Sequence, residues 1–409
     1  MAADYCVLKA TVYNVMDMKP LDVHAHGLRR LKTDTWTAVL AQEEELGDVT
    51  VVAVAAETLP GQRHTRYLVT LDGQPEAAPL WGTETTAGEA AFYREIGPSI
   101  PRLLPHCWWQ QESEAGGWLL LDEVPTCCPP EQWSTDDVEK VIAMLASLHA
   151  TFWKQRERLD AYAWLPQPWQ PHQNAPAPGY LEAWRFWDAM TGGGRALSYQ
   201  AVRNAGGMAP LLIRAAAGLE ILRRLRGWPG VIERQHLEAL TALLDDPLPL
   251  LHPLRELPLT LVHGNPAPRH WRLTLLGERR LTDWRGVAAG PGLSDLVRFT
   301  EAAASYDWPV DAQTMIDSYL LRLHVGLPGF DSRAARQALP AALCLYVITA
   351  WLPRFAEWFQ PFVHSPRTWA SLLAAGPDEL IARDCAHMVV YRGYLADLFV
   401  RFWHASNML

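Results

Sequence analysis

One stretch of the chain, residues 257–299, concentrates side chains that could carry chemistry. Its polar residues follow an apolar run, and among them are His263, Asn265, His270, Asp283 and Asp295. Carboxylates suit hard cations such as Mg²⁺, whereas imidazole suits Mn²⁺ or Zn²⁺ better. An amide accepts a hydrogen bond but cannot take up a proton, so it gives no general-base assistance. The stretch therefore offers the groups of a metal or ligand site, without a carboxylate between its two histidines.

The elements ahead of this stretch begin with β-strands. Residues 35–81 are predicted to form strands, with candidates at 50–56 and 66–71, where apolar and β-branched residues follow one another. A third candidate, 77–81, contains Pro79, which cannot donate to a β-ladder. We therefore expect this strand to be short, at an edge of the sheet, or distorted.

Beyond the strands the pattern changes to helices. Residues 88–96 have the apolar spacing of a helix and 118–121 that of a buried strand, and the segment 125–130 contains three prolines and cannot be helical. Ser134, with Asp137 three residues later, has the signature of a capped helix start. Further helices are predicted at 212–226, 233–244, 335–359 (interrupted or kinked at Pro340 and Pro353) and 378–403, with loops at 166–179 and 191–207.

This layout predicts an α+β protein with two lobes. The small β-rich N-lobe is expected to cover residues 1–124, with a hinge near 119–124. The large, mainly helical C-lobe is expected to cover residues 125–409 and to contain the stretch 257–299.

Composition and charge restrict the kinds of partner. The chain has 409 residues, of which 49% are hydrophobic and 20% charged, and its formal net charge is −9. Nucleic-acid binding needs clustered basic residues, and no Lys/Arg run here is longer than a pair, so no nucleic-acid partner is expected. The longest apolar stretches look too short to span a bilayer, and scattered cysteines fit a reducing compartment. We therefore expect a cytoplasmic protein without a membrane partner.

The motifs of residues 257–299 are similar to the catalytic core of the aminoglycoside phosphotransferase and choline kinase-like families. In those families an apolar strand leads to His-Gly-Asp, an Asn follows five residues after the Asp, and Asp-Trp comes on the next hairpin. This chain has His263-Gly264-Asn265, then His270 at the position of the Asn, then Asp283-Trp284. A Gly-Pro pair then precedes a helix that opens with Asp-Leu. The resemblance covers roughly residues 50–305 and implies the bilobal protein kinase-like fold.

The resemblance also implies roles for individual residues of the stretch. Asn265 stands at the position of the catalytic Asp, which orients the acceptor hydroxyl, and His270 and Asp283 stand at the metal-binding positions. His263 and Asp295 fall at positions expected to be structural. From the residues alone, Asp283 could instead be a strand-end carboxylate that caps a turn, and His270 could contact a metal, a ligand or neither.

On the nucleotide side, the resemblance places Glu89 in the helix that carries the family's lysine-pairing glutamate. It places the hinge at Leu121, Asp122 and Glu123. These four are the predicted nucleotide-binding residues, and the implied cofactors are ATP and Mg²⁺ or Mn²⁺. Without a lysine partner, Glu89 could also be a solvated helix acid.

The replaced residues lead to three hypotheses about function. The chain has no lysine between Lys32 and Lys140, a window that holds every strand able to carry the family's lysine. With Asn265 and His270 also replaced, the first hypothesis is a pseudokinase that binds a small molecule or a protein partner. The second is an unorthodox ATP-dependent phosphotransferase acting on a small hydroxylated metabolite or antibiotic, with Asp283 and His270 holding the metal. The third is a ligand-free scaffold protein.

Overall fold

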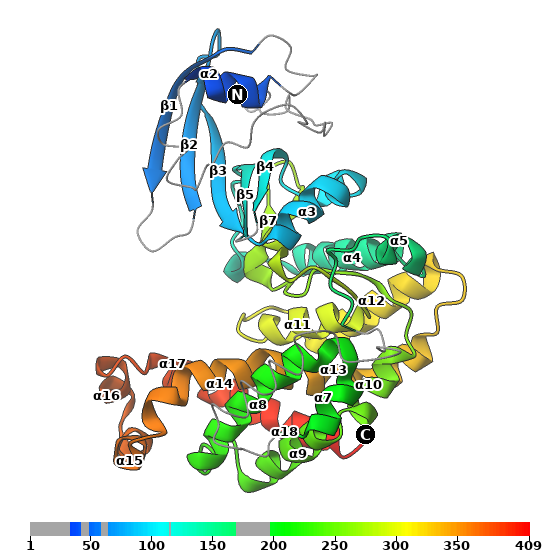
Figure 1. The fold of residues 1–409 in the computed structure, drawn as a ribbon, viewed down its shortest axis with the longest axis vertical. Helices are drawn as coiled ribbons and strands as arrows, with labels where there is room; N and C mark the ends of the chain where they lie inside the picture. The colour runs from blue at the N-terminus through cyan, green and yellow to red at the C-terminus, as the bar shows by residue number, and fades with distance from the viewer. Residues whose placement is uncertain (1–32, 42–48, 59–63, 114–115, 169–196) are drawn as a thin grey trace. The chain divides into compact units, whose positions relative to one another are not determined.

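A computed structural model describes residues 33–41, 49–58, 64–113, 116–168 and 197–409 (Figure 1). Strands dominate the N-terminal part and helices the rest, so the predicted α+β class is confirmed. The chain divides into two compact units, each described by itself below. We call residues 1–144, 162–165 and 263–287 the N-terminal unit, and residues 145–161, 166–262 and 288–409 the helical unit. These units are defined by contacts and are not the predicted lobes, whose boundary at residue 124 stays a prediction.

The N-terminal unit contains a five-stranded antiparallel sheet in the order β1-β2-β3-β5-β4. Its strands are β1 (Val51–Thr58), β2 (His64–Leu71), β3 (Ala78–Thr85), β4 (Cys107–Ser113) and β5 (Gly116–Asp122). The two first predicted strands and the buried strand at 118–121 are confirmed, whereas β4 was not predicted. One face of the sheet is covered by an apolar core that includes Tyr67, Trp108 and Trp118.

Residues 33–40 form a helix, α2 (Thr33–Leu40), where strand had been predicted from residue 35. Trp36, Val39 and Leu40 are its buried residues, and they recur at the i, i+3, i+4 spacing of a helix face. The Trp36 ring lies 5.0 Å from that of Tyr67 on β2. The apolar residues of this segment are therefore buried in the core, as predicted for a strand, but they lie on one face of a helix.

The third strand also differs from its prediction. β3 has eight residues and lies between β2 and β5, in the middle of the sheet. Pro79 is its second residue and pairs with Leu68, and the Pro79 carbonyl accepts a hydrogen bond from the Glu123 N–H at 3.2 Å. A proline near the start of a strand removes a single donor, so the rest of the ladder forms normally.

Two helices begin in the N-terminal unit as local signals predict, and residues from 145 of the second belong to the helical unit. The helix α3 (Ala87–Glu95) is capped by Thr86, whose hydroxyl accepts from the Glu89 N–H. The helix α4 (Thr135–Thr151) begins after Ser134, whose hydroxyl accepts from the Asp137 N–H while the Asp137 carboxylate accepts from Ser134. This reciprocal capping is the predicted one.

Short strands frame the stretch 257–299. In the N-terminal unit, β7 (Trp271–Leu273) and β8 (Arg279–Leu281) form a hairpin. In the helical unit, β6 (Thr260–Val262) pairs with β9 (Ala288–Gly290). Single 3-10 turns lie at Gly97–Ser99, Pro101–Leu103, Pro130–Gln132, Gly206–Met208, Pro268–His270, Trp284–Gly286 and Gln360–Phe362.

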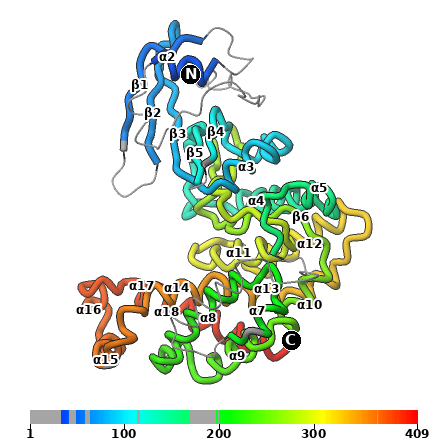
Figure 2. Tube along the Cα trace, in the orientation of Figure 1, coloured from blue at the N-terminus to red at the C-terminus, as the bar shows by residue number. Residues whose placement is uncertain are grey.

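The helical unit is built from many helices, among which α8 packs on α14 and α13 on α18 (Figure 2). The helices are α5 (Arg156–Asp160), α7 (Tyr199–Ala205), α8 (Ala209–Arg224), α9 (Arg234–Asp245), α10 (Leu248–Arg255), α11 (Leu293–Ala303), α12 (Ala312–Gly326), α13 (Ser332–Tyr346), α14 (Leu352–Phe359), α15 (Pro366–Ala374), α16 (Pro377–Ala382), α17 (Ala386–Val390) and α18 (Arg392–Ser406). The helices predicted at 212–226 and 233–244 are confirmed as α8 and α9.

Three predictions in this unit need correction. The helix predicted at 378–403 is broken into α16, α17 and α18, with Asp384 in a left-handed conformation between the first two. The segment 335–359 is interrupted by a π-helical turn at Val347–Trp351, and Pro340 lies inside α13 without ending it. The predicted loop at 191–207 contains α7, while most of the loop predicted at 166–179 lies outside the described residues.

Two helical stretches are long and apolar enough to cross a membrane by length and composition. This corrects the expectation that the longest apolar stretches are too short to span a bilayer. The two stretches are Gln200–Arg224 and Ser332–Phe362, and each joins consecutive helices. Buried residues make up 67% and 56% of their most apolar windows, as in core helices of a folded domain.

Candidate active site

The loop after β6 is fixed by His263. This side chain is fully buried, its Nε2 donates to the Thr282 carbonyl at 3.0 Å, and its Nδ1 accepts from the Asn265 N–H at 3.2 Å. The donor and acceptor roles of the two ring nitrogens are thus set by their partners. His263 ties residues 263–265 to the end of the β7–β8 hairpin, a contact typical of the predicted structural role.

The same loop is held from its other side by a close backbone contact. Gly264 has a φ of +82°, in the left-handed region that favours glycine. A Cβ added at Gly264 would lie closer than 3.0 Å to the carbonyl oxygen of Gly286. Only glycine therefore allows these two backbone segments to approach as they do.

Asn265 and His270, the two replaced residues of the motif, contact each other. The Asn265 side-chain nitrogen lies 3.2 Å from His270 Nε2, and His270 Nδ1 lies 3.5 Å from Asp283 Oδ2. An amide N–H that donates to Nε2 leaves the ring proton on Nδ1, where it faces the carboxylate. Burial lowers the pKa of His270 well below its ordinary value, although Asp283 opposes this, so the ring is neutral at physiological pH.

Asp283 is engaged by an arginine that follows it. Its backbone is left-handed, with a φ of +68°. Arg285 Nη2 donates to Asp283 Oδ2 at 2.8 Å, and Arg285 Nε donates to Oδ1. Burial would raise the pKa of Asp283, but the hydrogen bonds from Arg285 and the charges nearby hold it below its ordinary value. Asp283 makes no side-chain cap to the turn at Trp284–Gly286, so the alternative of a turn-capping carboxylate is wrong.

Glu89 is buried, and the alternative of a solvated helix acid is wrong. Its exposure is 5%. Glu89 Oε1 accepts from the Trp284 N–H at 2.6 Å, and Oε2 accepts from the Thr85 hydroxyl. Burial raises the pKa of Glu89 to about 7. The Phe92 ring, three residues further along α3, stacks on the Trp284 ring at 4.3 Å, so the helix and the turn after Asp283 form one packed contact.

The predicted hinge residues are engaged within the sheet. Asp122 accepts from the Trp108 indole N–H at 2.6 Å, and Glu123 accepts from the Arg66 guanidinium at 2.8 and 2.9 Å. Leu121 pairs with β3 and β4 and is half-buried. Their role in nucleotide binding stays a prediction.

Basic residues surround Asp283 in the N-terminal unit. Arg272 on β7 is half-buried, and its guanidinium donates to the Arg269 carbonyl at 2.8 Å. His64, the first residue of β2, has a pKa lowered by burial and by the charges of Arg285 and Arg272. The surroundings of Asp283 therefore carry more positive than negative charge, a feature that the motif comparison did not reveal.

Asp295 belongs to the helical unit, whereas the residues described above belong to the N-terminal unit. It is fully buried, with Oδ2 3.4 Å from His149 Nε2. His149 Nδ1 bonds to the Tyr319 hydroxyl at 2.6 Å, and its carbonyl accepts from the Thr260 hydroxyl at 2.7 Å. Asp295 thus joins α4, α11 and α12 inside this unit, a placement that agrees with a structural residue.

The described residues form no ready cage for a metal ion, since no group of three His, Cys, Asp or Glu residues among them could hold one. Mg²⁺ usually keeps several waters and is held by one or two carboxylates together with substrate phosphates, so its fit depends on the predicted pair. Of the predicted pair, His270 offers nitrogen and Asp283 is already bound by Arg285. The two lie close together, but the carboxylate of Asp283 is also bound by Arg285.

Comparison with known proteins adds a likeness to solved kinases. No family model and no curated protein matches the chain. An aminoglycoside phosphotransferase from Alicyclobacillus acidocaldarius is similar at 12% identity and a TM-score of 0.41, over 87% of this chain and 92% of that one. A choline/ethanolamine kinase family protein from Mesorhizobium loti is similar at 14% identity and a TM-score of 0.40, over 92% and 99%.

A spectinomycin phosphotransferase, solved with ADP and spectinomycin, is similar at 9% identity and a TM-score of 0.40, over 82% of this chain and 99% of that one. These structures are named as members of the families whose motifs residues 257–299 resemble. At such identities and scores the likeness carries no conclusion about activity.

Proposed function

We propose that this chain is a kinase-like protein that has lost phosphoryl transfer and works by binding. The observation that supports this most is the contact of Arg285 with both carboxylate oxygens of Asp283. Asp283 stands at the position of the family's principal metal-binding carboxylate. Arginine stays charged at any physiological pH, and its planar fork matches a carboxylate, so a divalent ion would have to displace it.

The acceptor side of the site supports the same proposal. Phosphoryl transfer relies on positioning and on a carboxylate that orients the acceptor hydroxyl. Asn265 has no such carboxylate, and its amide is directed at His270. Losing general-base assistance commonly costs about 10²–10⁴-fold in rate.

On the nucleotide side, Glu89 has other partners than the lysine with which the family's glutamate pairs. Glu89 accepts hydrogen bonds from the Trp284 N–H and the Thr85 hydroxyl. It therefore serves as a link between α3 and the turn after Asp283, in a chain with no lysine from residue 33 to residue 139. The resemblance implies ATP with Mg²⁺ or Mn²⁺. We propose that a nucleotide such as ATP would bind here without the metal, held by Arg272 and Arg285. The ligand would be a small molecule or a segment of a protein partner, in the cytoplasm.

The test combines turnover with nucleotide-induced stabilisation. We expect the wild-type protein to show no metal-dependent ATP turnover and a melting temperature that Mg²⁺ or Mn²⁺ does not change when nucleotide is present. Arg285→Gln frees Asp283, so this variant should gain a metal-dependent rise of about 2 °C or more. Arg102→Gln is the matched control, since Arg102 is exposed in the same unit and has no partner among the described residues.

Two other results would redirect the proposal. Sustained ATP turnover that Asp283→Asn abolishes would overturn it. If no nucleotide or small anion changes the melting temperature of either protein, the scaffold hypothesis is favoured.

One arrangement favours the unorthodox phosphotransferase as a second candidate. An imidazole with Nδ1 toward a carboxylate and Nε2 as acceptor has the geometry of a general base, and His270 lies in this way between Asp283 and Asn265. This candidate predicts ATP turnover that His270→Ala abolishes and that Asn265→Asp raises or leaves intact. Turnover unaffected by both changes would exclude it.

A further inference from the structure

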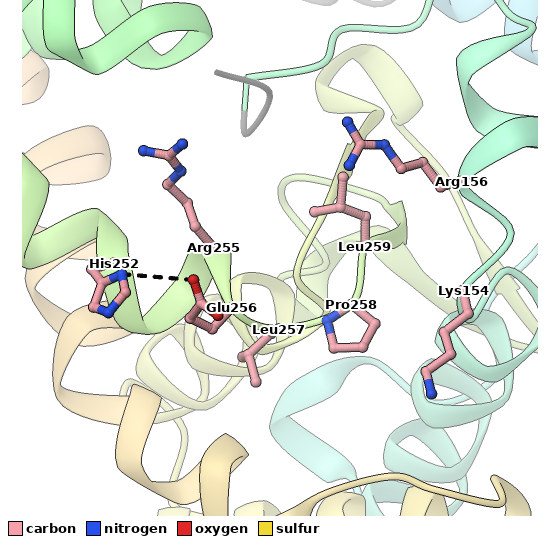
Figure 3. Close-up of a pocket in the computed structure, with 8 residues that line it drawn as sticks. All are labelled: Lys154, Arg156, His252, Arg255, Glu256, Leu257, Pro258 and Leu259. Atoms are coloured by element: carbon pink, nitrogen blue, oxygen red, sulfur yellow. Dashed lines mark ion pairs between the residues drawn. The ribbon is translucent and has the colours of Figure 1, made fainter.

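The helical unit contains a cavity of about 540 Å³ whose walls are rich in cations (Figure 3). Lys154 comes from the segment between α4 and α5, Arg156 is the first residue of α5, and Arg255 and His252 lie in the last turn of α10. Glu256 and the segment 257–259, which leads into β6, complete the described lining. A cavity of this size suits a small molecule.

The charges of this lining are not balanced within the described residues. His252 faces Glu256 at 3.7 Å, and Arg156 faces Asp160 at 3.4 Å. Lys154 and Arg255 have no acidic partner in the described part of the chain, and Arg255 is half-buried. Lys154 is exposed, but Arg255 is not, and a partly buried guanidinium without a counter-ion costs free energy.

The backbone at Lys154 gives a second, independent observation. Its φ is +55°, in the left-handed region that a residue with a Cβ seldom adopts. Strain of this kind persists where the surroundings hold it, and it clusters at functional positions. Here it sets the direction of one of the two unbalanced cations.

The cations lie at separate ends of an apolar wall. Figure 3 shows Lys154 and Arg255 on opposite sides of Leu257, Pro258 and Leu259, with the Arg156 side chain extended toward the same space as that of Arg255. A single compact anion would meet the cations of only one end. A longer ligand would meet both ends and cover the apolar residues between them.

We propose that this cavity binds an elongated small molecule with an anionic group at each end, of the bisphosphate class. The guanidinium groups of Arg255 and Arg156 receive one phosphate, since an arginine fork matches its oxygens. The Lys154 ammonium receives the other, and the body of the ligand packs on residues 257–259. This site is independent of the proposed function, because it shares no residue with the site around Asp283.

The test compares two probes on the full chain at constant ionic strength. Fructose 1,6-bisphosphate should bind at least about tenfold more tightly than fructose 6-phosphate in calorimetric titration, since one charged hydrogen-bonded contact is worth about that factor. Lys154→Gln or Arg255→Gln should each lower the affinity for fructose 1,6-bisphosphate about tenfold, and the double variant should bind the two probes equally. Lys154→Asn, which suits a left-handed backbone, replaces Lys154→Gln if the latter fails to fold.

Two controls place the binding. Arg322→Gln removes an exposed arginine of the same unit that lies outside the cavity, and it should leave both affinities unchanged. Arg285→Gln should also leave them unchanged. Equal binding of the two probes, or a preference that survives in the Lys154→Gln/Arg255→Gln protein, would overturn the proposal. Loss of binding in the Arg285→Gln protein would also overturn the proposal, because the bisphosphate would then bind at the site around Asp283.

Discussion

Replacing Gly264 by alanine is expected to destabilise the N-terminal unit by about 2–5 kcal/mol. About 1–2 kcal/mol comes from placing a Cβ on a left-handed backbone. The rest comes from the contact of that Cβ with the Gly286 carbonyl oxygen, because overpacking against an atom that cannot rotate away costs about 1–3 kcal/mol. The loop that carries Asn265 would have to move to relieve it.

Gly277→Ala separates the two contributions. Gly277 has a φ of +75°, close to that of Gly264, but an added Cβ there meets no atom within 4 Å. Denaturant unfolding of both variants should therefore show about 1–2 kcal/mol of destabilisation for Gly277→Ala and clearly more for Gly264→Ala. Equal losses would mean that the contact between residues 264 and 286 is not as close as described.

Local signals in the sequence predicted the parts of the fold that depend on neighbouring residues. The start of α4 follows from Ser134 and Asp137, which lie three residues apart and cap each other. The prediction for the strand at 77–81 is wrong because the cost of Pro79 depends on where in the strand the proline falls, and it falls at the second residue. The helix at Trp36 was not predicted because it has only eight residues and precedes a run of strands.

The chemistry of the site depends on contacts that cannot be predicted from the sequence. Motif order placed Asn265, His270 and Asp283 correctly as neighbours, since all three lie in one loop and hairpin. The bond from Trp284 to Glu89 joins residues 195 positions apart, so no spacing rule predicts it. Arg285 is only two residues from Asp283, yet their contact depends on the left-handed turn at Asp283, which a motif does not specify.

Glu89 provides the second large expected effect, a stability that depends on pH. Burial raises the pKa of Glu89 from 4.5 to about 7 in the folded chain. Between these values the folded protein holds a proton that the unfolded chain releases, so this contribution is fully present below pH 4.5 and is lost as the pH rises through 7. A shift of this size corresponds to about 3 kcal/mol.

Glu89→Gln should remove that dependence, because a neutral amide can still accept from the Trp284 N–H and can donate to the Thr85 hydroxyl. We expect the variant to match the wild type in free energy of unfolding near pH 4.5 and to exceed it by up to about 3 kcal/mol at pH 8, measured by urea denaturation across that range. Glu238→Gln, at an exposed position of α9, is the matched control and should show no such divergence. Parallel curves for Glu89→Gln and the wild type would mean that Glu89 stays ionised when folded. In that case burial would not raise the pKa of Glu89, and the pH dependence described above would have another source.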